Sequence, residues 1–365
     1  MEDLTSRALA LGQAMGFDRV GVAPALPTPQ TEFLRQWVAR GFAGEMQYLV
    51  RRLEERVDPR RVLEGARSII AVSLALGPEA EETPPGRAVG SVARYARGDD
   101  YHRVLGERLR AYENELVTLA GQPIRTKSYV DTGPVQERAY SAQAGIGWIG
   151  KNTCLIDPEL GSHLFLGVVL TDLPLRANAP MADHCGTCRA CLDACPTRAF
   201  DAPYVLDATR CLSYATIEQR GAIPDSMREA LGDRAFGCDL CQEVCPWNSR
   251  SGRRPPPDPL GLRARLAPRS EWGAPGLEWL LGLDEKNWRT ATRRMALRRS
   301  GHRGLLRNAL IAAGNSGDSA LIPAVQRHAA SEDPLLVDHA VWALARLRAT
   351  SRARAAGRGS GVTTS

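Results

Sequence analysis

The sequence predicts a chain of three folded parts: an α/β part, then a small cysteine-rich part, then an all-α part. Over the first part, apolar residues at helical spacing alternate with short apolar runs of strand length. Eight of the nine cysteines then fall between Cys185 and Cys245. A proline-rich connection at 253–259 precedes segments rich in Leu and Ala. We therefore place the parts at 1–175, 176–252 and 253–350, followed at 351–365 by a tail that lacks apolar periodicity and is predicted to be disordered.

The first part is predicted to begin with a helix, because Leu4, Ala8, Leu11 and Met15 repeat at helical spacing before Gly16. Strands are expected at 17–22, 68–74, 91–95, 124–130 and 163–170, with helices between them. The stretch 77–87 holds three prolines and three acidic residues, which predicts a surface loop. No apolar run approaches the ~18 residues of a membrane helix, and the start of the chain shows no export signal. We therefore expect a cytoplasmic protein without a membrane partner.

The densest motif of the first part starts at Asp131, directly after an expected strand, where open α/β sheets bind their ligands. Pro134 suits the first position of a helix that Thr132 or Gly133 would cap. From these residues alone, a turn and capping role for Asp131 is slightly favoured over a functional one. The glycines at 145, 147 and 150 predict backbone that passes close to a bulky ligand, although no phosphate-binding loop pattern is present.

The cysteines follow the spacing of iron–sulfur ligands. Two runs, each of the form Cys-x-x-Cys ending in Cys-Pro, start at Cys185 and Cys238. In bacterial two-cluster ferredoxins the cysteine before the proline binds the other cluster. We assign one [4Fe-4S] cluster to Cys185, Cys188, Cys191 and Cys245, and the second to Cys195, Cys211, Cys238 and Cys241. The part 176–252 is thus predicted to be ferredoxin-like and to conduct electrons. Structural zinc is the alternative, because it also binds four thiolates.

The positive charge of the chain is concentrated in one region. The net charge is +6, and residues 250–310 alone hold 14 Lys and Arg against 5 Asp and Glu. A localised basic surface favours a polyanionic partner, nucleic acid first, over a merely solvated face. The basic residues recur mostly every three or four positions, which predicts one helical flank along a phosphate backbone. The run consists of Lys286, Arg289, Arg293, Arg294, Arg298, Arg299 and Arg303. For the neighbouring Trp279 and Trp288, buried packing is favoured over stacking on bases.

From Leu305 to Leu347 the pattern is one of helices broken by Gly-Asn-Ser-Gly-Asp and by Asp-Pro. This pattern resembles HEAT-like repeats, in which neighbouring helices bury one another's apolar faces. Only about one and a half such units are visible, so we expect a short array. The ninth cysteine, Cys154, lies outside both ligand sets and is expected to be a small buried apolar residue, the alternative being a thiol near a bound cofactor.

Taken in order, the motifs resemble those of the epoxyqueuosine reductases, cobalamin-dependent iron–sulfur enzymes that complete queuosine in tRNA. The resemblance covers about residues 1–350. It is carried by Tyr95-Ala-Arg97-Gly-x-Asp-Tyr101-His102, Asp131-Thr-Gly-Pro, Ala144-Gly-Ile-Gly-Trp-Ile-Gly-Lys-Asn152, both cysteine runs and Asp239-Leu-Cys-Gln-Glu-Val-Cys-Pro-Trp-Asn248.

The resemblance implies reduction of epoxyqueuosine to queuosine at the wobble position of a tRNA anticodon, the last step of queuosine biosynthesis. Residues 1–175 would form a corrinoid-binding domain, and residues 253–350 would bind the tRNA through Lys286, Arg289, Arg293, Arg294 and Arg298. Asp131 would donate a proton, which requires a raised pKa. The expected cobalamin contacts are Arg94, Tyr95, Asp131, Lys151, Asn152, Leu155 and Ser213. A tRNA carrying epoxyqueuosine and an electron donor, protein or small reductant, are the expected partners of a monomer.

Two other classes of protein remain open at this point. A reductive dehalogenase would share cobalamin and clusters, but it would leave the basic C-terminal helices unexplained. A two-cluster electron carrier with a helical scaffold would leave the first 175 residues without a role. His102 is not expected to bind cobalt, because Leu105 stands where the corrinoid motif DxHxxG requires glycine.

Overall fold

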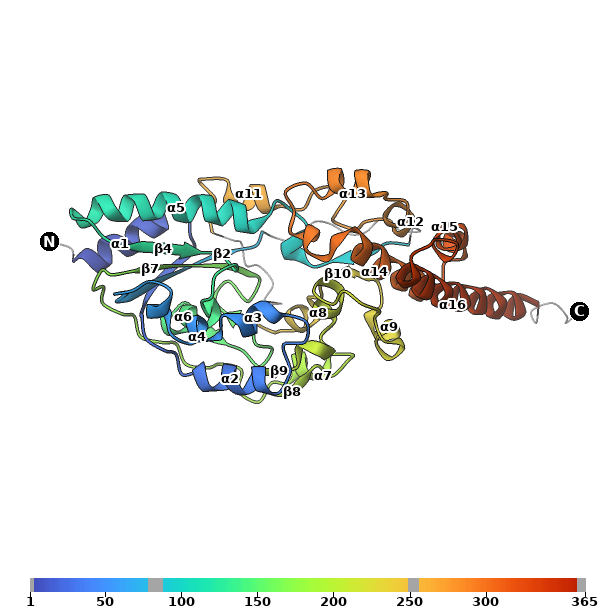
Figure 1. Cartoon of the computed structure of the whole chain (residues 1–365), viewed down its shortest axis with the longest axis horizontal. Coiled ribbons are helices and arrows are strands. Elements are labelled where there is room, and N and C mark those ends of the chain that lie inside the picture. The colour runs from blue at the N-terminus through green and yellow to red at the C-terminus, as the bar shows by residue number, and fades with distance from the viewer. Residues whose placement is uncertain (1–2, 78–87, 249–255, 360–365) are drawn as a thin grey trace, which may run out of the picture. The chain divides into compact units, whose positions relative to one another are not determined.

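The computed structural model describes residues 3–77, 88–248 and 256–359, and the chain folds into two compact units (Figure 1). The first unit comprises Met1–Glu79, Gly98–Thr209 and Asp239–Ala267. The second comprises Ala80–Arg97, Arg210–Cys238 and Pro268–Ser365. Each unit is therefore built from three separate stretches of the chain.

The first unit is organised around a four-stranded antiparallel sheet with the strand order β1-β2-β7-β4. The central strand β2 is buried along all eight of its residues, which explains its nearly continuous apolar sequence. The strands of the sheet are β1 (Arg19–Pro24), β2 (Ser68–Ala75), β4 (Thr126–Tyr129) and β7 (Leu164–Thr171). Two small hairpins complete the unit: β5 (Trp148–Ile149) with β6 (Leu155–Ile156), and β8 (Phe200–Ala202) with β9 (Val205–Leu206).

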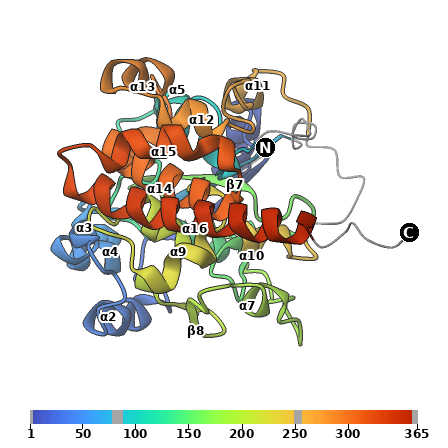
Figure 2. The same ribbon diagram turned by 90° about the vertical axis from the view of Figure 1, so that its right-hand side faces the viewer.

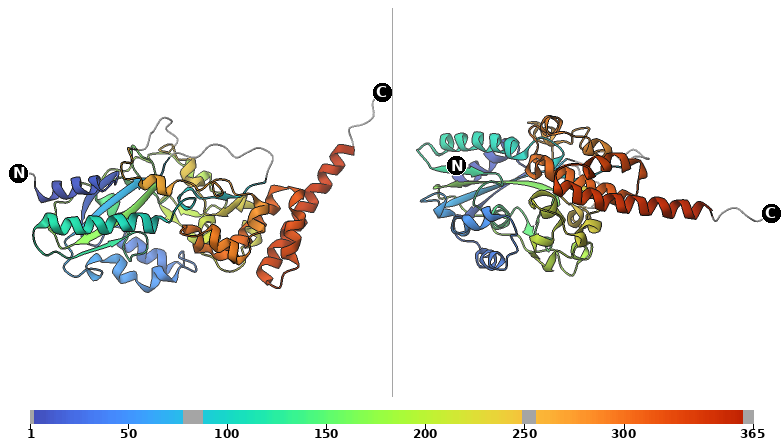
Figure 3. Two further views of the ribbon diagram at one scale, coloured as in Figure 1. Left: turned by 90° about the horizontal axis from the view of Figure 1, so that it is seen from above. Right: turned by 45° about the vertical axis from the view of Figure 1, so that its right-hand side comes forward.

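Helices cover both faces of this sheet. α1 (Leu4–Ala14) and α5 (Tyr101–Ala120) lie side by side on one face, where the Tyr112 hydroxyl donates to the Ala8 carbonyl at 2.7 Å (Figures 1 and 3). α6 (Glu137–Gln143) lies on the other face and packs its Tyr140 against the apolar side chains there. The remaining helices of the unit are α2 (Thr31–Ala39), α3 (Gln47–Arg51), α4 (Leu53–Val57), α7 (Ala190–Asp193), α10 (Leu240–Glu243) and α11 (Leu262–Leu266), with 3-10 turns at Pro59–Arg61 and Ala208–Arg210.

Most of the expected elements are confirmed, with shifted ends. The helix from Leu4 and the strands at 68–74 and 163–170 are present, β1 begins two residues later than expected, and β4 is shorter. The strand expected at 91–95 is mostly wrong. Only Ser91–Val92 is extended (β3), because Arg94–Ala96 forms a 3-10 turn, and β3 pairs with β10 (Arg234–Phe236) of the second unit instead of joining the main sheet.

The helix expected to open at Pro134 begins instead at Glu137, so the expected caps at Thr132 and Gly133 are wrong. The intervening residues form a tight bend, in which Asp131 has a φ of 59°. Gly133 lies against the ring of Tyr129, where a Cβ atom would approach a ring carbon to 2.3 Å. The bend after β4 is therefore fixed by close packing on that strand.

The second unit is mainly helical, and α14 (Gly301–Ser316) runs through its core. α16 (Pro334–Gly359) packs against α14 and α15 (Ile322–Ala329), as Figure 2 shows. The expected break after Ser316 is confirmed by Gly317, which ends α14 in a left-handed conformation. The other helices are α8 (Leu212–Ile217), α9 (Asp225–Leu231), α12 (Leu277–Leu281) and α13 (Glu285–Ala291), with 3-10 turns at Ala296–Ser300 and Ser319–Leu321.

Two expectations concern the edges of the described chain. The loop expected at 77–87 lies outside the described residues except for its first residue. The tail expected from residue 351 is corrected, because α16 continues as a helix to Gly359. Among the described residues, no helix is long and apolar enough to cross a membrane.

Candidate iron–sulfur and catalytic site

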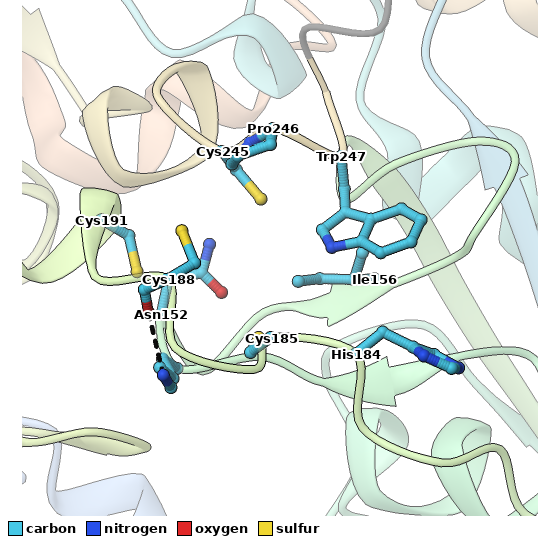
Figure 4. A pocket seen from close by; sticks show the side chains of 10 residues that line it. Asn152, Ile156, His184, Cys185, Cys188, Cys191, Cys245, Pro246 and Trp247 are labelled. Atoms are coloured by element: carbon cyan, nitrogen blue, oxygen red, sulfur yellow. Dashed lines mark hydrogen bonds between the residues drawn. The ribbon is translucent and has the colours of Figure 1, made fainter.

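Four of the predicted ligands line one pocket of the first unit. Cys185, Cys188, Cys191 and Cys245 surround a cavity of about 230 Å³, and Figure 4 shows their sulfur atoms around the same space. Cys191 lies on α7 and Cys245 directly follows α10, and these two short helices pack together. The fold therefore brings Cys245, which precedes the proline of the second run, to three cysteines of the first run, as predicted for this set of four.

The four thiols crowd one another. Burial, and after it the negative charges of Cys245, Cys185 and Cys188, raise the pKa of Cys191 to about 11. Burial likewise raises the pKa of Cys245. Four thiolates in such a place need a positively charged group at their centre, which is what the iron of a cluster supplies.

The loop between β5 and β6 holds both cysteine runs in place. The ammonium group of Lys151 donates to the carbonyl oxygens of Gly186 and Cys188, at 2.6 and 2.8 Å. The side-chain amide of Asn152, which is 3 % exposed, donates to the carbonyl of Cys241 at 3.2 Å. These two neighbouring residues thus fasten one run each.

A buried donor also lies among the residues packed against these cysteines. Trp148 is 3 % exposed, and its indole N–H has no acceptor of good geometry among the described residues. Its ring packs with Cys185, Cys245 and Trp247, and meets the Trp247 ring edge-on at 4.9 Å. An unsatisfied buried N–H beside four thiols fits a site whose occupant carries sulfur acceptors, as an iron–sulfur cluster does.

The second predicted set of ligands is divided between the units. Cys195 and Cys241 belong to the first unit, and Cys211 and Cys238 to the second. Two of these sulfur atoms accept hydrogen bonds: that of Cys195 from the Ala199 N–H at 3.3 Å, and that of Cys238 from the Arg234 Nε at 3.2 Å. Such bonds suit thiolate ligands, and the grouping of these four cysteines stays a prediction.

The ninth cysteine differs from its expectation. Cys154 is only partly buried, and a hydrogen bond with Cys241 lowers the pKa of its thiol despite the opposing effect of burial. It therefore lies beside a predicted cluster ligand instead of filling the apolar core.

Asp131 is the centre of a second group of polar residues in the first unit. The Tyr101 hydroxyl donates to Asp131 Oδ2 at 2.6 Å, and His102 Nε2 lies 3.5 Å from the same oxygen. On its other side, His102 Nδ1 lies 2.7 Å from Asp100 Oδ1. Asp100 caps the start of α5, so this helix places both Tyr101 and His102 against the Asp131 bend.

A proton is expected on Asp131 from the sequence, and the structure does not support this position. Burial raises the pKa of Asp131, but hydrogen bonds from His102 and Tyr101 outweigh it, so the pKa lies below its ordinary value of 3.8. The side chain is 63 % exposed, which weakens the effect of burial and favours the same direction. The raised pKa expected for Asp131 is therefore wrong for this arrangement.

Two neighbours of Asp131 carry the protons instead. Burial lowers the pKa of His102, but the hydrogen bonds and charges of Asp100 and Asp131 raise it to about 9. Burial and the charge of Asp131 raise the pKa of Glu137 to about 8, and Glu137 Oε1 accepts the backbone N–H of Asp131 at 2.5 Å. Near neutral pH the group thus holds protons on His102 and Glu137, next to a charged Asp131.

The expected cobalamin contacts are not brought together within one unit. Lys151 and Asn152 bond to the cysteine runs, and Leu155 is buried in β6. Arg94, Tyr95 and Ser213 belong to the second unit. The contacts of all these residues with cobalamin stay predictions.

The three glycines of the β5 region lie close to other parts of the protein itself, and their expected approach to a bulky ligand stays a prediction. A Cβ atom on Gly147 would meet the Ile156 carbonyl oxygen at 2.1 Å, and one on Gly145 would meet the Ala179 carbonyl oxygen at 2.6 Å. Gly150 is limited in the same way by the Ile156 side chain, at 2.4 Å.

The basic run of the second unit does not form one helical flank. α13 ends at Ala291, and a turn followed by a 3-10 helix carries the chain on to α14. The five predicted tRNA contacts, Lys286, Arg289, Arg293, Arg294 and Arg298, are nevertheless all exposed. Trp288 is 7 % exposed and Trp279 packs against the same core, so the favoured packing role is confirmed.

The site also contains residues to which the sequence reasoning gave no role. These are Tyr101, Glu137 and Trp148, together with His102, which was set aside as a cobalt ligand. Asp100, a helix-capping residue followed by two aromatic residues, was the sequence signal that could have indicated Tyr101 and His102. Nothing in the sequence indicated that Trp148 packs against Cys185 and Cys245.

Two features of the α/β unit define an iron–sulfur oxidoreductase. Four cysteines surround one pocket, and an aspartate lies among neighbours that carry protons. The family profile described as "4Fe-4S double cluster binding domain" matches residues 184–248, which include all eight predicted ligands. The profile described as "Epoxyqueuosine reductase QueG, DUF1730" matches residues 56–132.

Individual relatives match over nearly the whole chain. The epoxyqueuosine reductase of Xanthomonas campestris pv. campestris is 38 % identical over 348 residues, which cover 94 % of this chain and 96 % of the relative. A crystal structure of epoxyqueuosine reductase with an epoxyqueuosine-modified tRNA-Tyr stem loop is 31 % identical, with a TM-score of 0.85, over 94 % of this chain and 90 % of that chain. The Bacillus subtilis enzyme, solved with its catalytic aspartate loop swung out of the active site, is 30 % identical with a TM-score of 0.84 over the same shares. The chain belongs to the epoxyqueuosine reductase family.

Proposed function

We propose that this protein reduces epoxyqueuosine to queuosine in the anticodon of tRNA, with two [4Fe-4S] clusters and cobalamin as its cofactors. The observation that carries the proposal is the four-cysteine pocket in the same unit as the Asp131 group. A relative of the same fold has been solved with an epoxyqueuosine-modified stem loop, which supports the choice of substrate.

The reaction requires two electrons and two protons, because the epoxide oxygen leaves as water and a carbon–carbon double bond remains. Cobalamin, when bound, supplies the electrons to the substrate. The chain itself supplies the acid. Asp131 protonates the departing oxygen, and the relative solved with a catalytic loop that carries an aspartate supports this role.

The lowered pKa of Asp131 defines how its neighbours take part. Asp131 is charged near neutral pH, so the proton that reaches the substrate has to arrive through it from another group. His102 is such a source, because its imidazolium lies 3.5 Å from the carboxylate and keeps its proton up to about pH 9. Asp100 then stabilises the position of the ring from the other side.

The roles of the other regions belong to the same proposal. Residues 1–175 bind cobalamin and carry the acid, residues 176–252 bind the clusters, and the HEAT-like helices within 253–350 bind tRNA. Lys286, Arg293, Arg294 and Arg298 support the last role, because each is exposed and, within the described residues, none forms an ion pair with a carboxylate. A monomeric state, a cytoplasmic location and a separate electron donor stay predictions.

The proposal is tested by anaerobic turnover of epoxyqueuosine-containing tRNA, with and without cobalamin, read by mass spectrometry of the nucleosides. We expect cobalamin-dependent loss of one oxygen. In Asp131→Asn the rate should fall at least ~10²-fold, because the acid is lost while the hydrogen-bonding shape remains. Iron and sulfide contents should stay at the wild-type values. Absence of conversion by the fully loaded wild-type protein would reject the substrate.

A further inference from the structure

The pocket contains a feature that ligand spacing does not explain. Trp148 and Lys151 both come from the β5–β6 hairpin, outside the cysteine runs, yet both lie against the cysteines of this pocket. Trp148 packs with Cys185 and Cys245, and Lys151 lines the pocket. A segment that supplies no ligand thus brings a buried N–H and an ammonium group next to the four thiols.

We infer that Trp148 and Lys151 raise the reduction potential of the cluster held by Cys185, Cys188, Cys191 and Cys245, Trp148 by donating its indole N–H to sulfur of the loaded site and Lys151 by its fixed positive charge. The physical reason is that a reduced cluster carries one more negative charge than an oxidised cluster. A donor to a ligating sulfur stabilises the more negative state, so hydrogen bonds to sulfur raise the potential.

The indole is the stronger part of the inference. Its N–H is buried, has no other acceptor of good geometry among the described residues, and sits in a ring held rigidly by neighbours. The Trp247 ring meets it edge-on at 4.9 Å, and the His184 ring does so at 5.1 Å. A donor left without a partner in such a position is costly unless the occupant of the pocket accepts from it.

The side chain of Lys151 acts in the same direction. Its ammonium donates to the carbonyls of Gly186 and Cys188, so a positive charge is fixed beside the first cysteine run. A fixed cation also favours the more negative, reduced state. The segment 148–151 therefore positions and tunes a cluster that it does not ligate.

The test is a redox titration of the cluster-loaded protein, followed by electron paramagnetic resonance, for the wild type and Trp148→Phe. This change keeps an aromatic ring and removes only the indole N–H. We expect the ratio of reduced to oxidised cluster at a fixed potential to fall about tenfold, ~59 mV for a one-electron couple. Only one of the two clusters should shift.

Trp37→Phe is the matched control. The indole N–H of Trp37 donates to the Leu206 carbonyl at 2.6 Å, so this variant loses a comparable bond in the same unit without touching a cysteine. Its potentials should equal those of the wild type. Equal potentials in Trp148→Phe, or the same shift in both variants, would overturn the inference.

A second measurement decides the matter if Trp148→Phe does not take up the cluster. Wild-type protein labelled with ¹⁵N-indole tryptophan should show nitrogen coupling to the reduced cluster in pulsed resonance spectra. Absence of any such coupling in the loaded wild type would reject the hydrogen bond. Both measurements need no tRNA, so the outcome is independent of the proposed substrate, although the inference rests on the cluster assigned to this pocket.

Discussion

At the scale of single residues, the protons of the Asp131 group lie on other residues than the one proposed to deliver a proton to the substrate. Asp131 is held charged by donors, while His102 and Glu137 hold protons around it. An acid of this kind gains its proton only as negative charge develops on the substrate oxygen. Whether the group holds a proton to deliver then depends on the pKa values of His102 and Glu137, and not on burial of Asp131.

His102→Gln should slow the reaction and remove the fall in activity that the wild type shows above about pH 9. In the wild type the charged imidazole is held by Asp100 and Asp131, so the pKa rises from 6.5 to about 9. The stabilisation from this charge is fully present below pH 6.5 and is lost as the pH rises through about 9. We expect wild-type single-turnover rates to fall above about pH 9. The variant should be slower by ~10²-fold near pH 7.5, and its rate should not show this fall.

The control for this prediction is His328→Gln, in the second unit, where the ring contacts the Leu281 carbonyl at 2.8 Å. Its pH profile should match the wild type. If His102→Gln kept the same alkaline limb as the wild type, His102 would not be the proton source.

At the scale of elements, α14 holds the second unit together through two buried polar residues. Arg307 and Asn308 are fully buried, and Arg307 donates to the carbonyls of Ala215, Gln219 and Gly221 at 2.6 to 2.7 Å. These carbonyls include the C-terminal end of α8, where a positive charge is favourable. The segment that follows Cys211 is thus anchored to the core by one arginine.

Asn308→Ala should loosen this anchoring. The Asn308 amide donates to the carbonyls of Thr216 and Ala235, both at 2.8 Å, and the substitution leaves both carbonyls buried without a partner. We expect the opening free energy of α8 and β10 to fall by ~2–4 kcal/mol. Hydrogen exchange of the cluster-loaded protein measures this directly.

Asn287→Ala is the comparison, because Asn287 is exposed and its side-chain amide donates to the Asp284 carboxylate of the same turn, at 3.1 Å. Its effect should stay within ~0.5 kcal/mol. Equal protection of α8 in Asn308→Ala and the wild type would show that the helix is held by apolar packing alone.

At the scale of the whole molecule, the proposed tRNA surface is a set of exposed cations on several short elements. Arg293→Gln and Arg294→Gln should each weaken tRNA binding uniformly across sequences. Each should also reduce the slope of log affinity against log salt by about 0.7–0.9, because one phosphate contact is lost. Fluorescence anisotropy at several salt concentrations measures both quantities.

Arg303→Gln is the matched control within the same basic run. Arg303 is already paired with Asp333 at 2.6 Å, so it has less charge to offer to a phosphate. Its salt slope should stay close to the wild type. Equal slopes for all three variants would place the tRNA elsewhere on the protein.

The sequence predicted those features that local spacing determines. The first cluster pocket follows from the two cysteine runs, and β2 and β7 follow from their apolar patterns. It could not predict the pKa of Asp131, because Tyr101 and His102 reach it from the start of α5, about thirty residues earlier in the chain. The same holds for Lys151 and Asn152, whose partners are carbonyl groups that only the folded chain brings near.

The strand expected at 91–95 failed for a related reason. This segment belongs to the second unit, where β3 pairs with β10. The composition indicated that the segment is buried, but it did not indicate with which strand it pairs. The basic run failed because a period of three to four residues is compatible with several short turns as well as with one helix.

The position of Cys245 in the first cluster pocket has a consequence for biosynthesis. Cys185, Cys188 and Cys191 leave the ribosome well before Cys245, and the stretch Arg210–Cys238 of the second unit is made in between. A nascent chain therefore carries an incomplete, three-thiol site for as long as that stretch takes to appear. Iron delivered during this interval meets a site that lacks its fourth thiol. A complete [4Fe-4S] cluster can therefore be retained only once Cys245, at the end of the second run, has been made.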